Sequence, residues 1–308
     1  MRIIYMGTPE FACAPLRALW DAGHEIAAVF CQPDRPKGRG MKLVAPPVKE
    51  FALHYGIPVC QPESFRDHAA KPVLDQYQPD AIVVAAYGRL LPPYVLRAPK
   101  YGCINIHASL LPKYRGAAPI QYAILNGDKE TGVTVMHMAR ALDAGDMILA
   151  EKLKIDPYET AGELTARLSE AGAGLVCRAL AQIEAGTAPR IVQDEAAVSY
   201  APMITRADAR LDFHQPVRVV CDRARAMQPA PGAFAEADGA VFKIPALYDT
   251  GERCTAQPGT VLGLDGNGRM RIACSDGIAA APEIQAPSSR RMPCADYARG
   301  HALPEKFD

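Results

Sequence analysis

Two polar side chains, Asn105 and His107, close the short apolar segment CINIH. Successive side chains of a β-strand point to opposite faces, so residues two apart share a face. Acyl transfer needs a hydrogen-bond donor to a developing oxyanion and a group that moves a proton, which an amide and an imidazole can supply. The pair therefore suits acyl-transfer chemistry. A satisfied polar pair at the end of a strand is the structural alternative.

A carboxylate, Asp143, lies in the loop ALDAGDM between two strand-like segments, 133–138 and 147–149. We expect it at the carboxyl end of a strand, where it can orient or charge-stabilise His107 or hold a water that relays protons. Asp146 in the same loop is the competing carboxylate, and chemistry alone does not separate the two. For either residue the structural alternative is a turn-forming Asp beside Gly.

The residues that follow this strand, Ser109, Leu110, Leu111 and Pro112, predict an ordered loop. Its main-chain groups can bind a polar heterocycle without any special side chain. A purely structural loop, ending where a helix starts at Ala117, is the alternative.

The stretch QPDRPKGRGMKLVAPPV carries no acid after its single aspartate and four basic residues, Arg35, Lys37, Arg39 and Lys42. Its glycines make it flexible and its prolines keep it out of a helix. A basic, mobile loop next to a ligand edge fits a phosphate-bearing substrate. The alternative is a solvated run of charges.

The elements that must position these groups alternate between strand-like and helix-like segments. The apolar run AIVVAA at 81–86 is typical of a parallel strand that is covered on both faces. This alternation predicts an α/β fold with an open, mostly parallel, Rossmann-like sheet, whose ligands bind at the carboxyl ends of the strands. No G-x-G-x-x-G follows the first strand, so a dinucleotide site is not supported. The other predicted strands are 2–6, 25–31, 103–106 and 133–138, with a helix over 10–22.

The second half of the chain changes character. A long helical pattern over 160–185 is followed by short β-like runs at 240–244, 259–262 and 270–274, separated by turn residues. That spacing predicts a small β-barrel, similar to the OB fold. The expected division is a catalytic domain over 1–186, a linker over 187–206 and a barrel domain over 207–308.

Composition excludes several classes of protein. The chain has 308 residues with 34 basic and 34 acidic side chains, so a nucleic-acid partner must be argued from local patches. Nine scattered cysteines without a C-x-x-C pair predict reduced thiols and no metal site. The amino-terminal apolar run is too short for a signal peptide, and no segment approaches the roughly 20 apolar residues of a membrane span. We expect a cytoplasmic protein, and a monomer, because no apolar interface stripe is evident.

Taken together, the motifs resemble a known family. Asn105-x-His107, SLLPKYRGAAPIQ and LDAGDM are similar to the formyltransferases that use 10-formyltetrahydrofolate. QPDRPKGRG, VVAAYGRLLP and the opening MGTPEFA resemble, among these enzymes, the methionyl-tRNA formyltransferases. The resemblance covers nearly the whole chain and includes the tail, through PGAF, Gln285, Arg291-Met292 and 297–300. Three positions of the tail depart from the family pattern, at Ala230, Pro245 and Ser288-Ser289.

The resemblance implies roles for these residues. Asn105, His107 and Asp143 would be the catalytic constellation. The loop 109–112 would line the folate site, and the basic loop 35–42 would grip the acceptor end of the tRNA. The implied reaction moves the formyl group of 10-formyltetrahydrofolate to the α-amine of methionyl initiator tRNA, for translation initiation, without a metal. The barrel would bind tRNA.

Three alternatives stay open. The nearest is a folate-dependent formyltransferase that acts on a small amine, such as a ribonucleotide or an amino-sugar nucleotide. The basic loop and the barrel tail argue against it. A hydrolase that discharges formyl-folate to water should carry a different accessory domain. A non-catalytic RNA-binding protein on the same scaffold conflicts with the intact Asn105, His107 and Asp143, although fold alone does not imply function.

Overall fold

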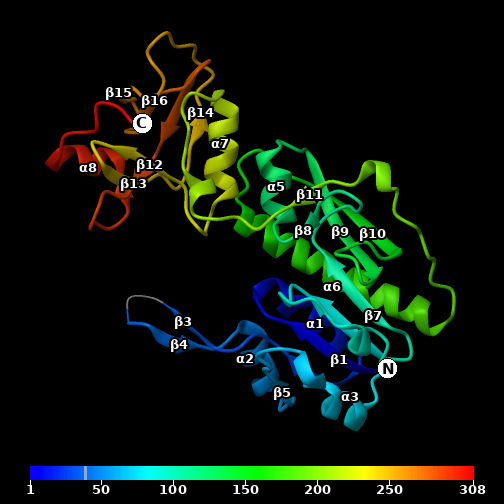
Figure 1. The fold of residues 1–308 in the computed structure, drawn as a ribbon. Helices are drawn as coiled ribbons and strands as arrows, with labels where there is room; N and C mark the ends of the chain where they lie inside the picture. Colours follow the sequence, from blue (N-terminus) through cyan, green and yellow to red (C-terminus); the bar gives the residue numbers. More distant parts are fainter. Residues whose placement is uncertain (38–39) are drawn as a thin grey trace. The chain divides into compact units, whose positions relative to one another are not determined.

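The structure, a computed structural model, describes residues 1–37 and 40–308 (Figure 1). It divides into two compact units. The first comprises Met1–Pro119, Glu130–Lys154 and Thr165–Pro202, and the second comprises Ile120–Lys129, Ile155–Leu164 and Met203–Asp308. Arg39, one of the four basic residues expected to bind tRNA, lies outside the described residues.

The first unit is built on a seven-stranded sheet with the order β10-β9-β7-β6-β1-β2-β5. Five neighbouring strands run parallel, and β9 and β10 add an antiparallel edge beside β7. The strands are β1 (Arg2–Gly7), β2 (Glu25–Phe30), β5 (Val59–Cys60), β6 (Ala81–Ala85), β7 (Cys103–His107), β9 (Glu130–His137) and β10 (Met147–Lys154).

Opposite faces of this sheet are covered by different helices. On one face Ile4, Phe30 and Val84 pack with Leu74 of α3 and Val95 of α4. On the other face α6 comes so close that a Cβ built on its Gly172 would lie 2.9 Å from Ile106 of β7. The helices of this unit are η1 (Glu10–Ala12), α1 (Cys13–Asp21), α2 (Pro47–His54), η2 (Arg66–His68), α3 (Lys71–Tyr77), α4 (Pro93–Leu96) and η3 (Glu195–Ala197). The long helix α6 (Ala161–Glu184) begins in the second unit.

Because side chains alternate along β7, the packing of α6 on Ile106 turns Asn105 and His107 to the opposite face. Cys103 shares that face and is covered there by α4, where its thiol donates to the Val95 carbonyl at 3.6 Å. The side chains of Asn105 and His107, in the carboxyl half of β7, therefore lie beyond the part of this face that α4 covers.

Two short strand pairs complete the first unit. The basic segment expected as a loop forms a hairpin of β3 (Arg35–Lys37) and β4 (Lys42–Val44). Strand β8 (Arg115–Gly116), which follows the loop after β7, pairs in parallel with β11 (Tyr200–Ala201). The segment 187–206, expected as a linker, thus contains a strand that is hydrogen-bonded next to the candidate site.

The second unit is built on antiparallel strands. A four-stranded sheet has the order β14-β17-β16-β15, and two further pairs are β12-β13 and β18-β19. Isolated bridges between Lys243 and Gln285 and between Thr260 and Lys306 tie these pieces together. The elements are α5 (Pro119–Leu125), η4 (Ala207–Ala209), α7 (Val217–Ala226), β12 (Phe234–Ala237), β13 (Ala240–Lys243), β14 (Tyr248–Asp249), β15 (Val261–Leu264), β16 (Met270–Ala273), β17 (Ile278–Ala281), β18 (Glu283–Ile284), β19 (Met292–Pro293) and α8 (Cys294–Gly300).

The predicted fold class is confirmed: a mostly parallel Rossmann-like sheet is followed by a smaller unit of antiparallel strands. The helix expected over 10–22 begins as a 3-10 turn and becomes α-helical at Cys13. The division of the chain at 186 and 206 stays a prediction.

Candidate active site

The Asn105 side chain is buried and free to bind a ligand. It is 8% exposed, and it makes no hydrogen bond with any residue that the structure describes. Its amide atoms are not sealed from solvent, so they can meet a bound ligand. An amide held on a rigid strand without a protein partner suits the expected role of donor to an oxyanion.

His107 is fixed through one of its two ring nitrogens. Its Nε2 lies 2.8 Å from the main-chain oxygen of Tyr114. A carbonyl oxygen only accepts hydrogen bonds, so Nε2 carries a hydrogen. The other nitrogen, Nδ1, lies 3.7 Å from Oδ2 of Asp143, and both side chains are nearly buried. The structure therefore brings the histidine and the carboxylate of the predicted constellation together.

Asp143 reaches His107 by a route that the sequence did not indicate. Strand β9 runs antiparallel to β7 and pairs its His137 with Ile104, so the carboxyl end of β9 lies beside the amino end of β7. The loop after β9 therefore has to return along β7 to bring Asp143 to His107. The Asp143 carboxylate is held there by the main-chain amide of Gly116, which donates to Oδ2 at 2.9 Å.

The competing carboxylate, Asp146, is engaged elsewhere. Its side chain forms an ion pair with Arg190 at 3.0 Å, and its main-chain oxygen accepts from the amide of His137. Burial lowers the pKa of His137, Arg190 acts in the same direction, and Asp146 opposes them. The geometry favours Asp143 as the carboxylate that serves His107.

The loop 109–112 is ordered by Thr134 of β9. The hydroxyl of Thr134 donates to the Ser109 carbonyl at 2.7 Å and accepts from the Leu111 amide at 3.1 Å. The Leu110 carbonyl accepts from the amide of Lys113. The loop therefore lies directly after His107 in a fixed conformation, with several of its main-chain groups already engaged.

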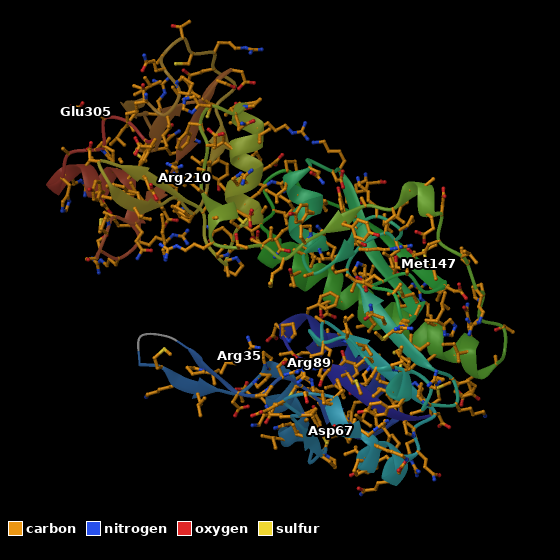
Figure 2. The ribbon with its side chains drawn as sticks, viewed as in Figure 1. Arg35, Asp67, Arg89, Met147, Arg210 and Glu305 are labelled. Atoms are coloured by element: carbon orange, nitrogen blue, oxygen red, sulfur yellow. The ribbon has the colours of Figure 1, made fainter. Side chains whose placement is uncertain are left out.

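Sequence reasoning missed a polar network at the carboxyl ends of β1, β2 and β6. Nε of Arg89, a residue labelled in Figure 2, donates to the Gln32 side chain at 3.1 Å. Gln32 and Thr8 both donate to the Tyr87 carbonyl. Burial raises the pKa of Tyr87 to about 12, and its hydroxyl finds no partner among the described residues. Each of these residues follows a strand of the parallel sheet, which is the edge where such sheets bind ligands.

The β3-β4 hairpin is anchored at its base and exposed beyond it. Asp34 accepts hydrogen bonds from Gln61 and Lys49, both at 2.8 Å, and these two bonds lower the pKa of its carboxyl, the Gln61 bond having the larger effect. Arg35 and Lys42 are exposed, and so are Met41 (69%) and Leu43 (70%). The basic side chains thus stand beside apolar ones on a projecting element.

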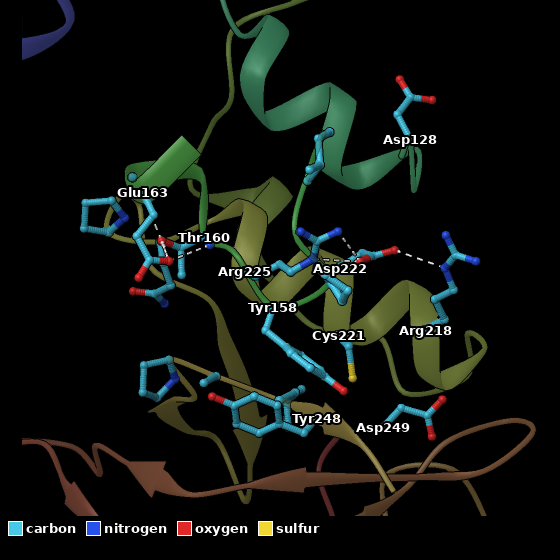
Figure 3. A pocket seen from close by; sticks show the side chains of 18 of the residues that line it. Asp128, Tyr158, Thr160, Glu163, Arg218, Cys221, Asp222, Arg225, Tyr248 and Asp249 are labelled. Carbon is cyan, nitrogen blue, oxygen red and sulfur yellow. Dashed lines mark hydrogen bonds and ion pairs between the residues drawn. The ribbon is translucent and has the colours of Figure 1, made fainter. Parts of the chain in front are cut away.

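A cavity of about 700 Å³ lies within the second unit (Figure 3). Two tyrosine rings, Tyr158 and Tyr248, line it with their centroids 5.4 Å apart. On α7 the Asp222 carboxylate pairs with Arg225 at 2.8 Å and Arg218 at 3.6 Å. These two cations are therefore neutralised within α7.

Two negative findings concern the described residues only. They contain no group of three or more His, Cys, Asp or Glu side chains that could hold a metal ion. None of their helices combines the length and the apolar character that crossing a membrane would require.

Comparison with known proteins identifies the family. Residues 1–180 match the family described as formyl transferase, and residues 203–302 match the formyl transferase C-terminal domain. A curated relative from Syntrophus aciditrophicus (strain SB), named methionyl-tRNA formyltransferase, is 45% identical over 301 residues, which cover 98% of this chain and 96% of the relative.

Two solved structures share the fold. The N-formyltransferase from Helicobacter canadensis, in complex with folinic acid and dTDP-3-aminofucose, has a TM-score of 0.68 at 18% identity and covers 93% of this chain and 99% of its own. HypX from Aquifex aeolicus, in complex with tetrahydrofolic acid, has a TM-score of 0.65 at 21% identity and covers 96% of this chain and 46% of its own. At these identities the likeness concerns the fold alone.

Proposed function

The chain belongs to the formyl transferase family, and we propose that it transfers the formyl group of 10-formyltetrahydrofolate to the α-amine of methionyl initiator tRNA. The product, N-formylmethionyl-tRNA, serves translation initiation. The acceptor is inferred from relatives that carry the name methionyl-tRNA formyltransferase and match this chain over nearly its full length.

The main support for acyl-transfer chemistry is the arrangement of side chains on one face of β7. Asn105 offers an amide without a partner among the described residues, beside an imidazole whose Nδ1 faces the Asp143 carboxylate at 3.7 Å. An oxyanion donor and a proton-transfer pair are the two functions that acyl transfer to an amine requires.

The reaction begins with attack of the neutral α-amine on the formyl carbon. A model α-amine titrates at about 7.7–8.0, and the neighbouring ester lowers this further, so a neutral fraction exists near pH 7. The new C–N bond converts the formyl oxygen to an oxyanion, to which the Asn105 amide donates. Collapse of this intermediate breaks the bond to the folate nitrogen, and the proton lost by the amine ends on that nitrogen.

The fixed side of the histidine ring suggests the path of the proton. Nε2 of His107 is held by the Tyr114 carbonyl, so Nδ1 and the Asp143 carboxylate form the side of the pair that exchanges a proton. Their separation of 3.7 Å exceeds a direct hydrogen bond and leaves room for closure on substrate binding or for a bridging water.

We assign the remaining contacts as follows. The loop of Ser109, Leu110, Leu111 and Pro112 binds the folate, since it is rigid and lies directly after His107. The hairpin binds the acceptor end of the tRNA through Arg35, Lys37, Arg39 and Lys42. The second unit adds tRNA affinity and no chemistry. Because the whole chain has no net charge, this affinity must come from local groups.

The enzyme is expected to act in the cytoplasm, as a monomer and without a metal. Size-exclusion chromatography with light scattering measures the mass in solution, and a value near twice the 33.1 kDa of the chain would contradict a monomer. Full activity after exhaustive chelation is the corresponding expectation for the metal.

Transfer of labelled formyl from 10-formyltetrahydrofolate tests the function directly. Charged initiator methionyl-tRNA should accept the label, while uncharged tRNA should not. Transfer to an amino-sugar nucleotide or an aminoribonucleotide at a higher rate would favour the alternative, a formyltransferase for small amines. Release of labelled formate without any acceptor would indicate a hydrolase.

A further inference from the structure

Gln193 uses its whole side-chain amide to tie two segments of the candidate site together. Its side chain is buried, at 5% exposure. Nε2 donates to the main-chain oxygens of Asp143 at 2.7 Å and Gly145 at 2.9 Å. Oε1 accepts from Nε and Nη2 of Arg115 at 3.0 and 2.9 Å. One glutamine therefore joins the loop that carries Asp143 to strand β8.

The partner of this glutamine is itself fixed. Arg115 is 4% exposed, and its guanidinium pairs with Glu195 through Nη2 at 2.7 Å. Its main-chain amide donates to the Ser199 carbonyl at 2.8 Å, which continues the pairing of β8 with β11. Gln193 and Glu195 thus hold Arg115 from the same segment, the first as a buried partner and the second as an exposed one.

Gly116, the residue after Arg115, holds the side chain of Asp143. Its amide donates to the carboxylate, and its φ is +127°. A Cβ at this position would lie 2.4 Å from the Ala201 oxygen, so only glycine permits this approach. Asp143 is therefore fixed at two points, its main-chain oxygen by Gln193 and its carboxylate by Gly116.

We propose that Gln193 is a positioning residue for formyl transfer, which acts by holding Asp143 in register with His107. The inference rests on the proposed function, because its effect passes through Asp143. Asp143 has a φ of +49°, a left-handed conformation that is uncommon outside glycine although Asp adopts it more readily than most residues, and its hydrogen bonds help to hold it there. Without Gln193 two inward-facing carbonyls lose their donors, and the loop turns to find others.

The chemistry of the side chain explains why a glutamine stands here. A glutamate accepts from Arg115 but cannot donate to the two carbonyls, whereas a leucine fills the space and does neither. Gln193→Glu therefore keeps the link to Arg115 and sets an accepting oxygen against the two carbonyls, whereas Gln193→Leu removes both links. If one of the two variants fails to fold, the other still tests the proposal.

The test is a mutant cycle in the full-length enzyme, with charged initiator tRNA as the acceptor. Gln193→Glu and Gln193→Leu should each lower kcat by about tenfold to a hundredfold, the size expected from a displacement of about 1 Å in a catalytic group. The KM for the folate should change by less than about threefold, since the loop 109–112 keeps its own anchor on Thr134. In an Asp143→Ala background, Gln193→Leu should lower kcat by less than about twofold, because the group that it positions is gone.

Gln182→Leu is the matched control. Gln182 is a half-buried glutamine of the same unit, its Oε1 has no partner among the described residues, and the variant should keep kcat. Equal losses from Gln193→Leu with and without Asp143 would overturn the positioning role and leave a general structural one. Unchanged kcat in both Gln193 variants, with Asp143→Ala impaired, would overturn this inference and leave the proposed function intact. Unchanged kcat in Asp143→Ala would overturn the proposed mechanism itself.

Discussion

His107 and Asp143 face each other through Nδ1 and Oδ2, 3.7 Å apart, while the far nitrogen of the ring is held by the main-chain oxygen of Tyr114 at 2.8 Å. The ring therefore cannot turn to exchange its two nitrogens without losing a hydrogen bond in a buried setting. This asymmetry leaves Nδ1 as the ring nitrogen that is available to exchange a proton with Asp143. Substituting one residue at a time measures what each contributes to kcat.

The first prediction concerns the two carboxylates of the β9-β10 loop. Asp143→Ala should lower kcat by about 10²–10⁴-fold, the range for a group that takes part in proton transfer. Asp146→Ala should cost much less, because Asp146 pairs with Arg190 and not with His107. Steady-state kinetics with charged tRNA compares the two, with folding checked by circular dichroism. A larger loss in Asp146→Ala would exchange the roles.

A second prediction follows from the unpartnered amide. Asn105→Ala should lower kcat by about 10²–10³-fold, as expected for one oxyanion donor. It should hardly change Tm, because no hydrogen bond to the described chain is lost. Thr134→Val is the contrasting variant. It leaves the Leu111 amide without its partner and should cost about 1–3 kcal/mol of stability. A fall in Tm for Asn105→Ala as large as for Thr134→Val would mean that the amide is structural.

The third prediction concerns the basic hairpin. Replacing Arg35, Arg39 or Lys42 by Ala should raise the KM for tRNA by roughly fivefold each, since an exposed charge contact contributes about 1 kcal/mol. Binding of the folate should be unchanged. Each phosphate contact that is lost should also reduce the slope of log affinity against log salt by about 0.7–0.9.

Lys71→Ala is the control for the hairpin variants. Lys71 is an equally exposed lysine on α3, and it pairs with Asp75. Unchanged tRNA kinetics in all hairpin variants at low and moderate salt would reduce this segment to a solvated run of charges. It would also remove the structural argument against a formyltransferase for small amines and leave the relatives as the support for a tRNA acceptor.

The fourth prediction concerns acid. Hydrogen bonds from Gln61 and Lys49 lower the pKa of Asp34 below its ordinary 3.8. The stability that they contribute is fully present above 3.8 and is lost as the pH falls through the lowered pKa of the folded state. The difference in Tm between the wild type and Asp34→Asn should therefore be constant from neutral pH down to about 4.5 and shrink below that. A constant difference down to pH 2.5 would exclude Asp34 as an acid-sensitive anchor of the hairpin.

Parts of the fold followed from the sequence because they depend on local pattern. The continuous apolar runs of β1 and β6 are buried as expected, and the spacing of Asn105 and His107 placed both on one face. Strand β17, by contrast, reads Ile-Ala-Ala-Ala, so only its first residue is of the β-branched or aromatic kind that marks a strand. Only its pairing with β16 and β14 makes it one, and that pairing is not local.

The site was harder to predict for a related reason. Main-chain groups hold the two site side chains: the Tyr114 oxygen contacts His107, and the Gly116 amide contacts Asp143. Such main-chain groups have no signature in the sequence. Gln193 lies 50 residues from the loop that it holds, in a segment whose weak pattern indicated a linker. Its significance depends on Arg115, which the sequence analysis treated as part of a motif and not as an anchor.

Because Gln193 is synthesised after Asp143, the hydrogen bonds between them can form only late in translation. At about 5–20 residues per second, Asp143 leaves the ribosome roughly 2.5–10 s before Gln193, since 50 residues separate them. During that interval the chain contains Asn105 and His107, but the loop that carries Asp143 lacks its hydrogen bonds to Gln193. The chain must reach Ala201, which pairs with Gly116, before the constellation is complete. The last residues of the first unit, which end at Pro202, therefore set the earliest moment at which a growing chain can complete this arrangement.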